Sequence, residues 1–207
     1  MAEIAANIDQ KTIYTFFNYI HSFFFLLIFS ILMSVLLVYP TYSYGSICLQ
    51  LIFLSNWVYW VHRLSHNLPN SLLNYHLYSH HNKALHLPRH IELAFEFFTD
   101  LSWFGILLLL NLLLKYICNI SFLSNTLILF IGIWYSSVHV LNLSLFNDHV
   151  HKYHHKDSNY NYGPPYIDFM FGTLQMDDSY TTNSEITNGL VVFFLLKAIQ
   201  KIVPFDV

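Results

Sequence analysis

Twelve of the thirteen histidines lie between His62 and His155, and most of them form three clusters. The spacing is i, i+4 in the first cluster, i, i+4, i+5 in the second and i, i+3, i+4 in the third. The members are His62, His66, His76, His80, His81, His151, His154 and His155. On a helix, residues three and four positions apart share one face. Neutral imidazole is a good ligand for iron, zinc, copper and nickel. We therefore interpret the three clusters as metal ligands.

Eight histidines exceed the number of ligands that one ion can use. With His139 and one or more of three neighbouring histidines added, the count suits two ions held close together. These neighbours are His86, His90 and His149. Each of them is either a further ligand or an exposed or hydrogen-bonded side chain, and both interpretations stay open.

The sequence also bears on the identity of the metal. Cys48 and Cys118 lie in or beside apolar runs and indicate neither a disulfide framework nor a thiolate site. Structural zinc sites usually contain cysteine and need only four ligands. A histidine-dominated site with many ligands favours redox-active iron. Two irons could reduce dioxygen and oxidise an unactivated C–H bond, and apolar surroundings would suit that reaction because they exclude water.

Long apolar runs must position these histidines. The chain is 55% hydrophobic and only 10% charged, whereas a soluble domain carries about 25% charged residues. Four runs are candidates for transmembrane helices, which need about 20 apolar residues. The sequence therefore predicts an all-α integral membrane protein, with 1–207 as a single domain. The four runs are 13–39, 46–61, 97–114 and 122–141, and a last apolar stretch, 189–203, is expected to lie on the membrane surface or to pack on the domain.

Four spans would place all the histidine clusters on the same side of the membrane as the N-terminus. Eight of the nine basic residues fall on that side, and only Lys115 falls on the other. The positive-inside rule then makes the histidine side cytosolic. A net charge of −3 without a basic patch argues against nucleic-acid binding.

The three clusters, in this order, resemble those of the fatty acid hydroxylase / sterol desaturase superfamily of integral-membrane di-iron enzymes. The first cluster, His62-x-x-x-His66, begins within Trp60-Val61-His62-Arg63. Downstream, Asn161-Tyr162-Gly163 followed by Asp168-Phe169-Met170-Phe171-Gly172-Thr173 is similar to the ending of that family. The resemblance covers about residues 55–175.

The resemblance implies an oxidoreductase of lipid biosynthesis in the endoplasmic reticulum membrane. It would use O2 and electrons from an external donor protein, such as cytochrome b5 or an NAD(P)H-linked reductase, to hydroxylate or desaturate a fatty acyl or sterol lipid. The eight clustered histidines match the ligand motifs of the family, and His139 matches a further ligand position. Two positions depart from the pattern. Ile167 replaces the usual Trp, and Leu143 stands where a partner of His139 is expected, so that Asn142 or His149 would have to supply that ligand.

Acidic residues are candidates for orienting the ligand histidines. Glu92, Glu96 and Asp100 lie near the start of the third span, and we take Glu96 as the residue that supports a ligand, with a solvated helix entrance as the alternative. Asp168 is a second such candidate because of its place in the ending motif.

Two other classes of function stay open. One is a histidine-lined protein for metal transport or storage, which would need ionisable groups along the spans. The other is a catalytically inactive family member that acts as a scaffold, which the departures at Leu143 and Ile167 would favour.

Overall fold

The computed structural model describes residues 10–68, 76–81, 87–146, 149–175, 183–203 and 205–206, and these residues form helices and no strands, so the prediction of an all-α chain is confirmed. Two of the helical segments, labelled η, are π-helices. In chain order the segments are α1 (Gln10–Val38), α2 (Tyr44–Asn67), η1 (His76–His81), α3 (Arg89–Cys118), α4 (Asn125–Ser136), η2 (Ser137–Phe146), α5 (His149–Lys156), α6 (Pro165–Phe171) and α7 (Asn183–Gln200).

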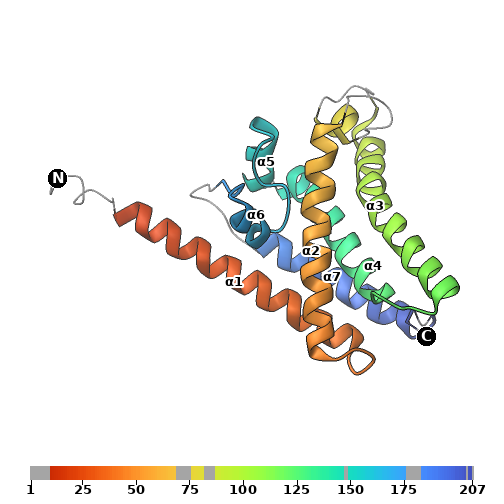
Figure 1. Ribbon diagram of the computed structural model, residues 1–207. Coiled ribbons are helices and arrows are strands. Elements are labelled where there is room, and N and C mark those ends of the chain that lie inside the picture. Colours follow the sequence, from red (N-terminus) through yellow and green to blue (C-terminus); the bar gives the residue numbers. More distant parts are fainter. Residues whose placement is uncertain are drawn as a thin grey trace.

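Helix α4 lies at the centre of the fold and contacts α1, α2, α3 and α7. Its side chains are largely buried, and Leu127, Ile128 and Phe130 are fully enclosed. The surrounding helices bury one face against this core and expose the other. In Figure 1 the turns between α1 and α2 and between α3 and α4 lie at one end, while η1 and the C-terminal end of α2 lie at the other. The histidine-bearing segments thus gather at one end of the helices.

A polar cluster fixes the start of α4. Ser124 is the N-cap, and its hydroxyl accepts a hydrogen bond from the Leu127 N–H at 3.2 Å. The Asp206 carboxylate accepts from the Ser124 hydroxyl at 2.8 Å and from the Asn125 N–H at 2.7 Å. Gln50 of α2 accepts from the Ser124 N–H at 2.7 Å. The unpaired N–H groups that begin any helix therefore find partners here although this end is buried.

Two helices are long and apolar enough to cross a membrane, α1 over Ile20–Val38 and α3 over Arg89–Cys118. Both expose large apolar side chains along their outer faces, such as Ile28 and Leu32 on α1 and Leu109 on α3. The other two expected spans do not meet the same criteria. Helix α2 carries Gln50, Asn56 and the first histidine pair, and α4 is α-helical for only 12 residues before η2 begins. A four-span arrangement therefore stays a prediction.

The last apolar stretch forms α7, which packs on the domain against α1, α4 and η2. The contact is close at Gly189, where an added Cβ would lie 2.7 Å from a ring carbon of Phe29 and 2.9 Å from one of Trp134. The indole N–H of Trp134 donates to the Glu185 carbonyl at 2.7 Å. Of the two expected placements of this stretch, the structure has the packed one.

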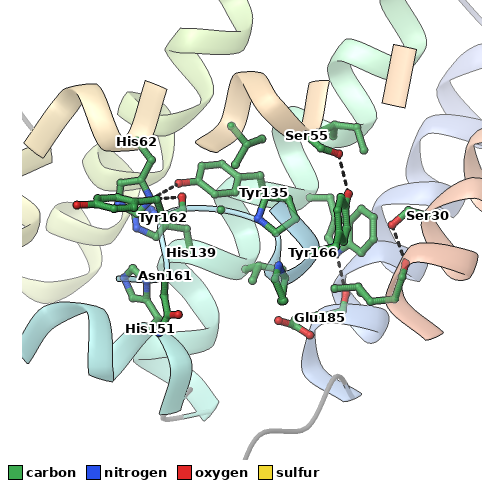
Figure 2. Close-up of a pocket in the computed structure, with 18 residues that line it drawn as sticks. Ser30, Ser55, His62, Tyr135, His139, His151, Asn161, Tyr162, Tyr166 and Glu185 are labelled. Carbon is green, nitrogen blue, oxygen red and sulfur yellow. Dashed lines mark hydrogen bonds between the residues drawn. The ribbon is translucent and has the colours of Figure 1, made fainter. Parts of the chain in front are cut away.

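A cavity runs between α1, α2, α4, α6 and α7 (Figure 2) and, with its open mouth, encloses about 840 Å³. Most of its lining is apolar, including Leu26, Val58, Ile131 and Val138. His62, His139 and His151 also line it, together with Ser30, Ser55, Trp134, Tyr135, Asn161, Tyr162, Gly163, Pro164, Pro165, Tyr166 and Glu185. The mixture of an apolar wall with a few polar groups is typical of small-molecule sites.

Gly132 of α4 should be the glycine whose replacement most disturbs the packing of α3 on α4. A Cβ added there would lie 2.7 Å from Cγ of the Phe104 ring and 2.8 Å from its Cβ. We expect Gly132→Ala to destabilise the fold by about 1–3 kcal/mol, the usual cost of overpacking. Gly105→Ala is the matched control, because an added Cβ there has no neighbour within 4 Å. Gly132→Ala should lower the midpoint of thermal unfolding, whereas Gly105→Ala should not lower it. Equal midpoints in the two variants would contradict the packing argument.

Candidate metal centre

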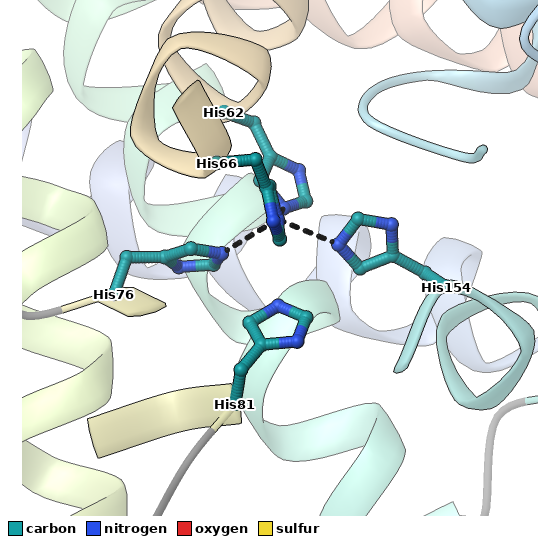
Figure 3. A group of neighbouring side chains, drawn as sticks. All are labelled: His62, His66, His76, His81 and His154. Carbon is teal, nitrogen blue, oxygen red and sulfur yellow. Dashed lines mark hydrogen bonds between the residues drawn. The ribbon is translucent and has the colours of Figure 1, made fainter. Parts of the chain in front are cut away.

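The first group of histidines contains His62 and His66 of α2, His76 and His81 of η1 and His154 of α5. One ring nitrogen from each lies within 4.8 Å of one from every other member. Figure 3 shows the five rings facing a common point. The Nε2 atom of His66 lies 3.2 Å from that of His62, 3.2 Å from that of His76 and 2.9 Å from that of His154.

We define the second group as His80 of η1, His139 of η2 and His151 and His155 of α5. It combines the close set of His80, His139 and His151 with His155, which lies beside His80 and His151. The Nε2 atoms of His80, His151 and His155 are 2.9–3.0 Å from one another. The rings of His139 and His151 meet edge to face, with centroids 4.1 Å apart. The two groups adjoin, since His81 of the first also forms a close set with His80 and His155. All nine histidines predicted as ligands thus come together in two adjoining groups.

The two π-helices explain how neighbouring histidines divide between the groups. Hydrogen bonds in a π-helix join residues five apart, so that i, i+4 and i+5 all lie close to one face. In η1 this brings His76, His80 and His81 to the same face, from which His76 and His81 join the first group and His80 the second. In η2 the wider turn begins two residues before His139. Such segments occur often at functional sites.

The outward nitrogens of the rings are held by acceptors. The Nδ1 of His62 is 2.5 Å from the Tyr162 carbonyl, and that of His154 is 2.5 Å from the Tyr160 carbonyl. A carbonyl oxygen only accepts, so each of these Nδ1 atoms must carry the hydrogen. The Nε2 of a neutral ring is then a bare lone pair directed into the group. This arrangement is the one found for histidines that bind metals.

The inward nitrogens fit a metal better than they fit one another. Two lone pairs that face each other at about 3 Å repel, since neither nitrogen has a hydrogen to donate. A metal bound to imidazole at about 2.0–2.1 Å places its ligands at roughly this separation. In addition, the Nε2 atoms of His81 and His139 are buried and have no hydrogen-bond partner within the described part of the chain. The residues present therefore suit metal ions in both groups.

Burial keeps several of these rings neutral. Burial lowers the pKa of His66 to about 3 and that of His154 to about 4, each far below the usual 6.5. Burial also lowers the pKa of His76 to about 3, against the opposing effect of Asp100. The rings are thus in the neutral form that binds metals at pH 7 without prior loss of a proton.

Two carboxylates of α3 hold the outward nitrogens of other rings. Glu96, the predicted supporting residue, lies 3.0 Å from Nδ1 of His80. Asp100 accepts from Nδ1 of His139 at 2.5 Å and lies 3.7 Å from Nδ1 of His76, so it supports both groups. The sequence placed Asp100 near the site but did not select it. Its position one helical turn after Glu96, on the same face, was the available signal.

Asp168 acts on the site through the backbone. Its carboxylate accepts from the Tyr162 N–H at 3.0 Å, the Gly163 N–H at 2.9 Å and the Thr173 hydroxyl at 2.8 Å. These bonds fix the loop whose carbonyl groups hold His62 and His154. Burial raises the pKa of Asp168 to about 7, and the three donors act against that rise. Asp168 therefore lies one step further from the metal groups than Glu96.

Of the other candidate ligands, some lie away from the two groups and others fall outside the described residues. His90 is exposed and joins neither group. Asn142 is buried in η2, where its side-chain oxygen accepts from the Asn188 amide of α7 at 2.7 Å. His86 and the side chains of Leu143 and His149 fall outside the described residues. Ile167 is buried against Tyr59 and Tyr162, so this departure from the family pattern affects packing rather than a ligand.

Asp100→Asn should weaken metal binding in both groups. The amide has one acceptor oxygen where the carboxylate has two, one bonded to the Nδ1–H of His139 and the other 3.7 Å from Nδ1 of His76. Loss of such outer partners typically costs 10–100-fold in metal affinity. Glu92→Gln is the matched control, because Glu92 lies on the same helix and binds Arg89 at 2.7 Å. Metal content measured after dialysis against a graded chelator should fall for Asp100→Asn and stay unchanged for Glu92→Gln. Equal retention in both variants would contradict this role.

Comparison with known proteins agrees with the geometry. The model of the family described as fatty acid hydroxylase matches residues 47–173. This range begins in α2, ends at Thr173 and contains both histidine groups. Searches of curated proteins and of solved structures find no match.

Proposed function

The chain belongs to the fatty acid hydroxylase family, and from this premise we propose that it is a membrane-bound di-iron oxidoreductase that hydroxylates or desaturates a lipid. The family is typically iron-dependent, and the two histidine groups could hold metal ions. The proposal places the protein in the endoplasmic reticulum membrane with the histidine groups on the cytosolic side. Electrons would come from an external donor such as cytochrome b5 or an NAD(P)H-linked reductase.

One observation carries the proposal. Nine histidines from four helical segments form two adjoining groups, and three of these histidines, His62, His139 and His151, also line the apolar cavity. Metal ligands and an apolar cavity therefore share a wall. That arrangement supports oxidation of a molecule held in the cavity better than it supports a purely structural metal site, which would be closed on all sides.

The chain's own residues would perform three tasks. The inward Nε2 atoms of the two groups would hold the ions, and bound iron would supply the activation of dioxygen. The carbonyl groups of Tyr160 and Tyr162 and the carboxylates of Glu96 and Asp100 keep those rings oriented. The apolar wall of the cavity excludes water and admits a hydrocarbon chain. A hydroxylation would consume one C–H bond, dioxygen, two electrons and two protons, and would give an alcohol and water.

The structure offers less support for the alternatives. A transporter needs ionisable groups along the span, but the buried acidic residues of α3 (Glu92, Glu96 and Asp100) all lie in its first half, beside the histidines. An inactive scaffold would be favoured by a missing ligand. All nine predicted ligands are present in the two groups, and Ile167 lies in the packed core.

The test is lipid mass spectrometry of cells that express the protein, compared with cells that lack it. We expect a lipid that gains one oxygen or loses two hydrogens, with formation that depends on O2. The purified protein should contain iron. Absence of iron, or an unchanged lipid profile with iron present, would contradict the proposed function.

A further inference from the structure

Two hydroxyl groups face each other inside the cavity. Ser55 of α2 and Tyr166 of α6 lie with their oxygens 2.6 Å apart, and both residues line the cavity (Figure 2). Ser55 is 2% exposed. The ring of Tyr166 is held from α1 by Phe23, which meets it edge to face with centroids 5.9 Å apart. Three helices thus fix this hydroxyl pair.

The pair has one hydrogen more than it can use. Two hydroxyls carry two hydrogens, and only one can lie between the two oxygens. Within the described part of the chain neither hydroxyl has a further hydrogen-bond partner. Burial raises the pKa of Tyr166 to about 12, so its hydroxyl stays protonated at neutral pH. One donor is therefore left over in apolar surroundings, where an unused donor is costly.

Other hydroxyls of the cavity differ from this pair. The Ser30 hydroxyl donates to the Leu26 carbonyl of its own helix at 2.7 Å, so its hydrogen is used. The Tyr135 hydroxyl lies 3.0 Å from Nδ1 of His62 and belongs to the surroundings of the metal groups. The surplus donor at Ser55 and Tyr166 lies away from those groups. Ser55 precedes His62 by two helical turns, which is roughly 10 Å along α2.

We propose that the Ser55–Tyr166 pair donates a hydrogen bond to an oxygen atom of the lipid in the cavity. The substrate class is then an oxygen-bearing lipid, such as an alcohol, ether, ester or ketone, rather than a plain hydrocarbon. The bond would set how far the lipid reaches towards His62 and so which carbon is presented to the metal groups. This inference rests on the proposed function, because it takes the cavity to be the lipid site.

Equilibrium binding to the purified full chain in detergent tests the proposal without turnover. The probes are radiolabelled hexadecane, hexadecan-1-ol and hexadecyl methyl ether, which share a sixteen-carbon chain and differ in the group at its end. In the double variant Ser55→Ala/Tyr166→Phe, the alcohol and the ether should bind about five- to tenfold more weakly, the usual effect of losing one hydrogen bond. Binding of hexadecane should change less than about twofold.

Two further variants make the test decisive. Tyr166→Phe keeps the ring in place and leaves the Ser55 hydroxyl, so it should show a smaller loss of the same kind, about two- to fivefold. Ser136→Ala is the control, because this buried hydroxyl of α4 does not line the cavity and already donates to the Gly132 carbonyl at 2.8 Å. This variant should bind all three probes like the unchanged protein.

Three outcomes would overturn the inference. Equal weakening of all three probes would mean that the pair only shapes the cavity. Unchanged binding of all three would mean that water takes up the surplus donor. If no probe binds to the unchanged protein, the cavity is not the lipid site, and the proposed function loses its main support as well.

Discussion

Replacing His154 with alanine is expected to lower the bound metal from about two ions per chain to about one and to abolish turnover. His154 is fully buried, and its Nε2 lies 2.9 Å from that of His66 at the centre of the first group. Its loss removes a ligand outright, which should weaken that site by more than the roughly 100-fold upper range seen for loss of an outer partner. The second group keeps all four of its histidines.

Elemental analysis of the purified variant, together with O2-dependent lipid turnover, measures this effect. His90→Ala is the control, since His90 is an exposed histidine that joins neither group. His151→Ala should empty the second group and leave the first, so that the two ligand variants lose different ions. Full metal content or full turnover in His154→Ala would contradict the assignment of this residue.

Asp168→Ala should destabilise the fold by about 3–5 kcal/mol and weaken metal binding as well. The change leaves the N–H groups of Tyr162 and Gly163 without their acceptor, and each unsatisfied buried group costs about 1–3 kcal/mol. The loop would then no longer fix the carbonyl groups that hold His62 and His154. The unfolding midpoint should fall by roughly 10 °C for a chain of this size.

Thermal unfolding in detergent and metal content together check this prediction. Asp157→Ala is a suitable control, because Asp157 lies in the same region and its side chain accepts from the N–H and the amide of Asn159 at an exposed turn. That variant should lose less than about 1 kcal/mol. A stable Asp168→Ala protein with full metal content would mean that the loop keeps its shape without the carboxylate.

The helical fold and the convergence of the histidines were predictable from the sequence. The spacing of the histidines predicted that His62 lies beside His66, and His151 beside His154 and His155. Neighbours at i, i+3 and i+4 share a face in any α-helix. The length of the apolar runs predicted which segments would carry them. Among the described residues, α1 and α3 meet the length and composition expected of spans, whereas α2 is interrupted by polar residues and α4 gives way to η2.

The details that orient the site were not predictable. Whether a histidine-rich segment winds as an α-helix or a π-helix depends on tertiary contacts, so the division of His80 and His81 between the groups was not visible in the spacing. The Tyr160 and Tyr162 carbonyl groups carry no side-chain signal, because every residue has a carbonyl group. Glu92 and Asp100 each lie one helical turn from Glu96 on the same face, so this spacing alone did not select Asp100, and only the fold turns it towards His76 and His139.

The cap at the start of α4 has a consequence for the order in which the protein matures. Asn125 and Ser124 depend on Asp206, which lies 81 and 82 residues later in the chain. At synthesis rates of about 5–20 residues per second, Asp206 is made roughly 4–16 s after the start of α4, and these hydrogen bonds form only after that interval. The same helix leads into η2 and His139. The helix that leads to His139 of the second group is therefore capped only late in biogenesis, after the three histidine clusters have all been made.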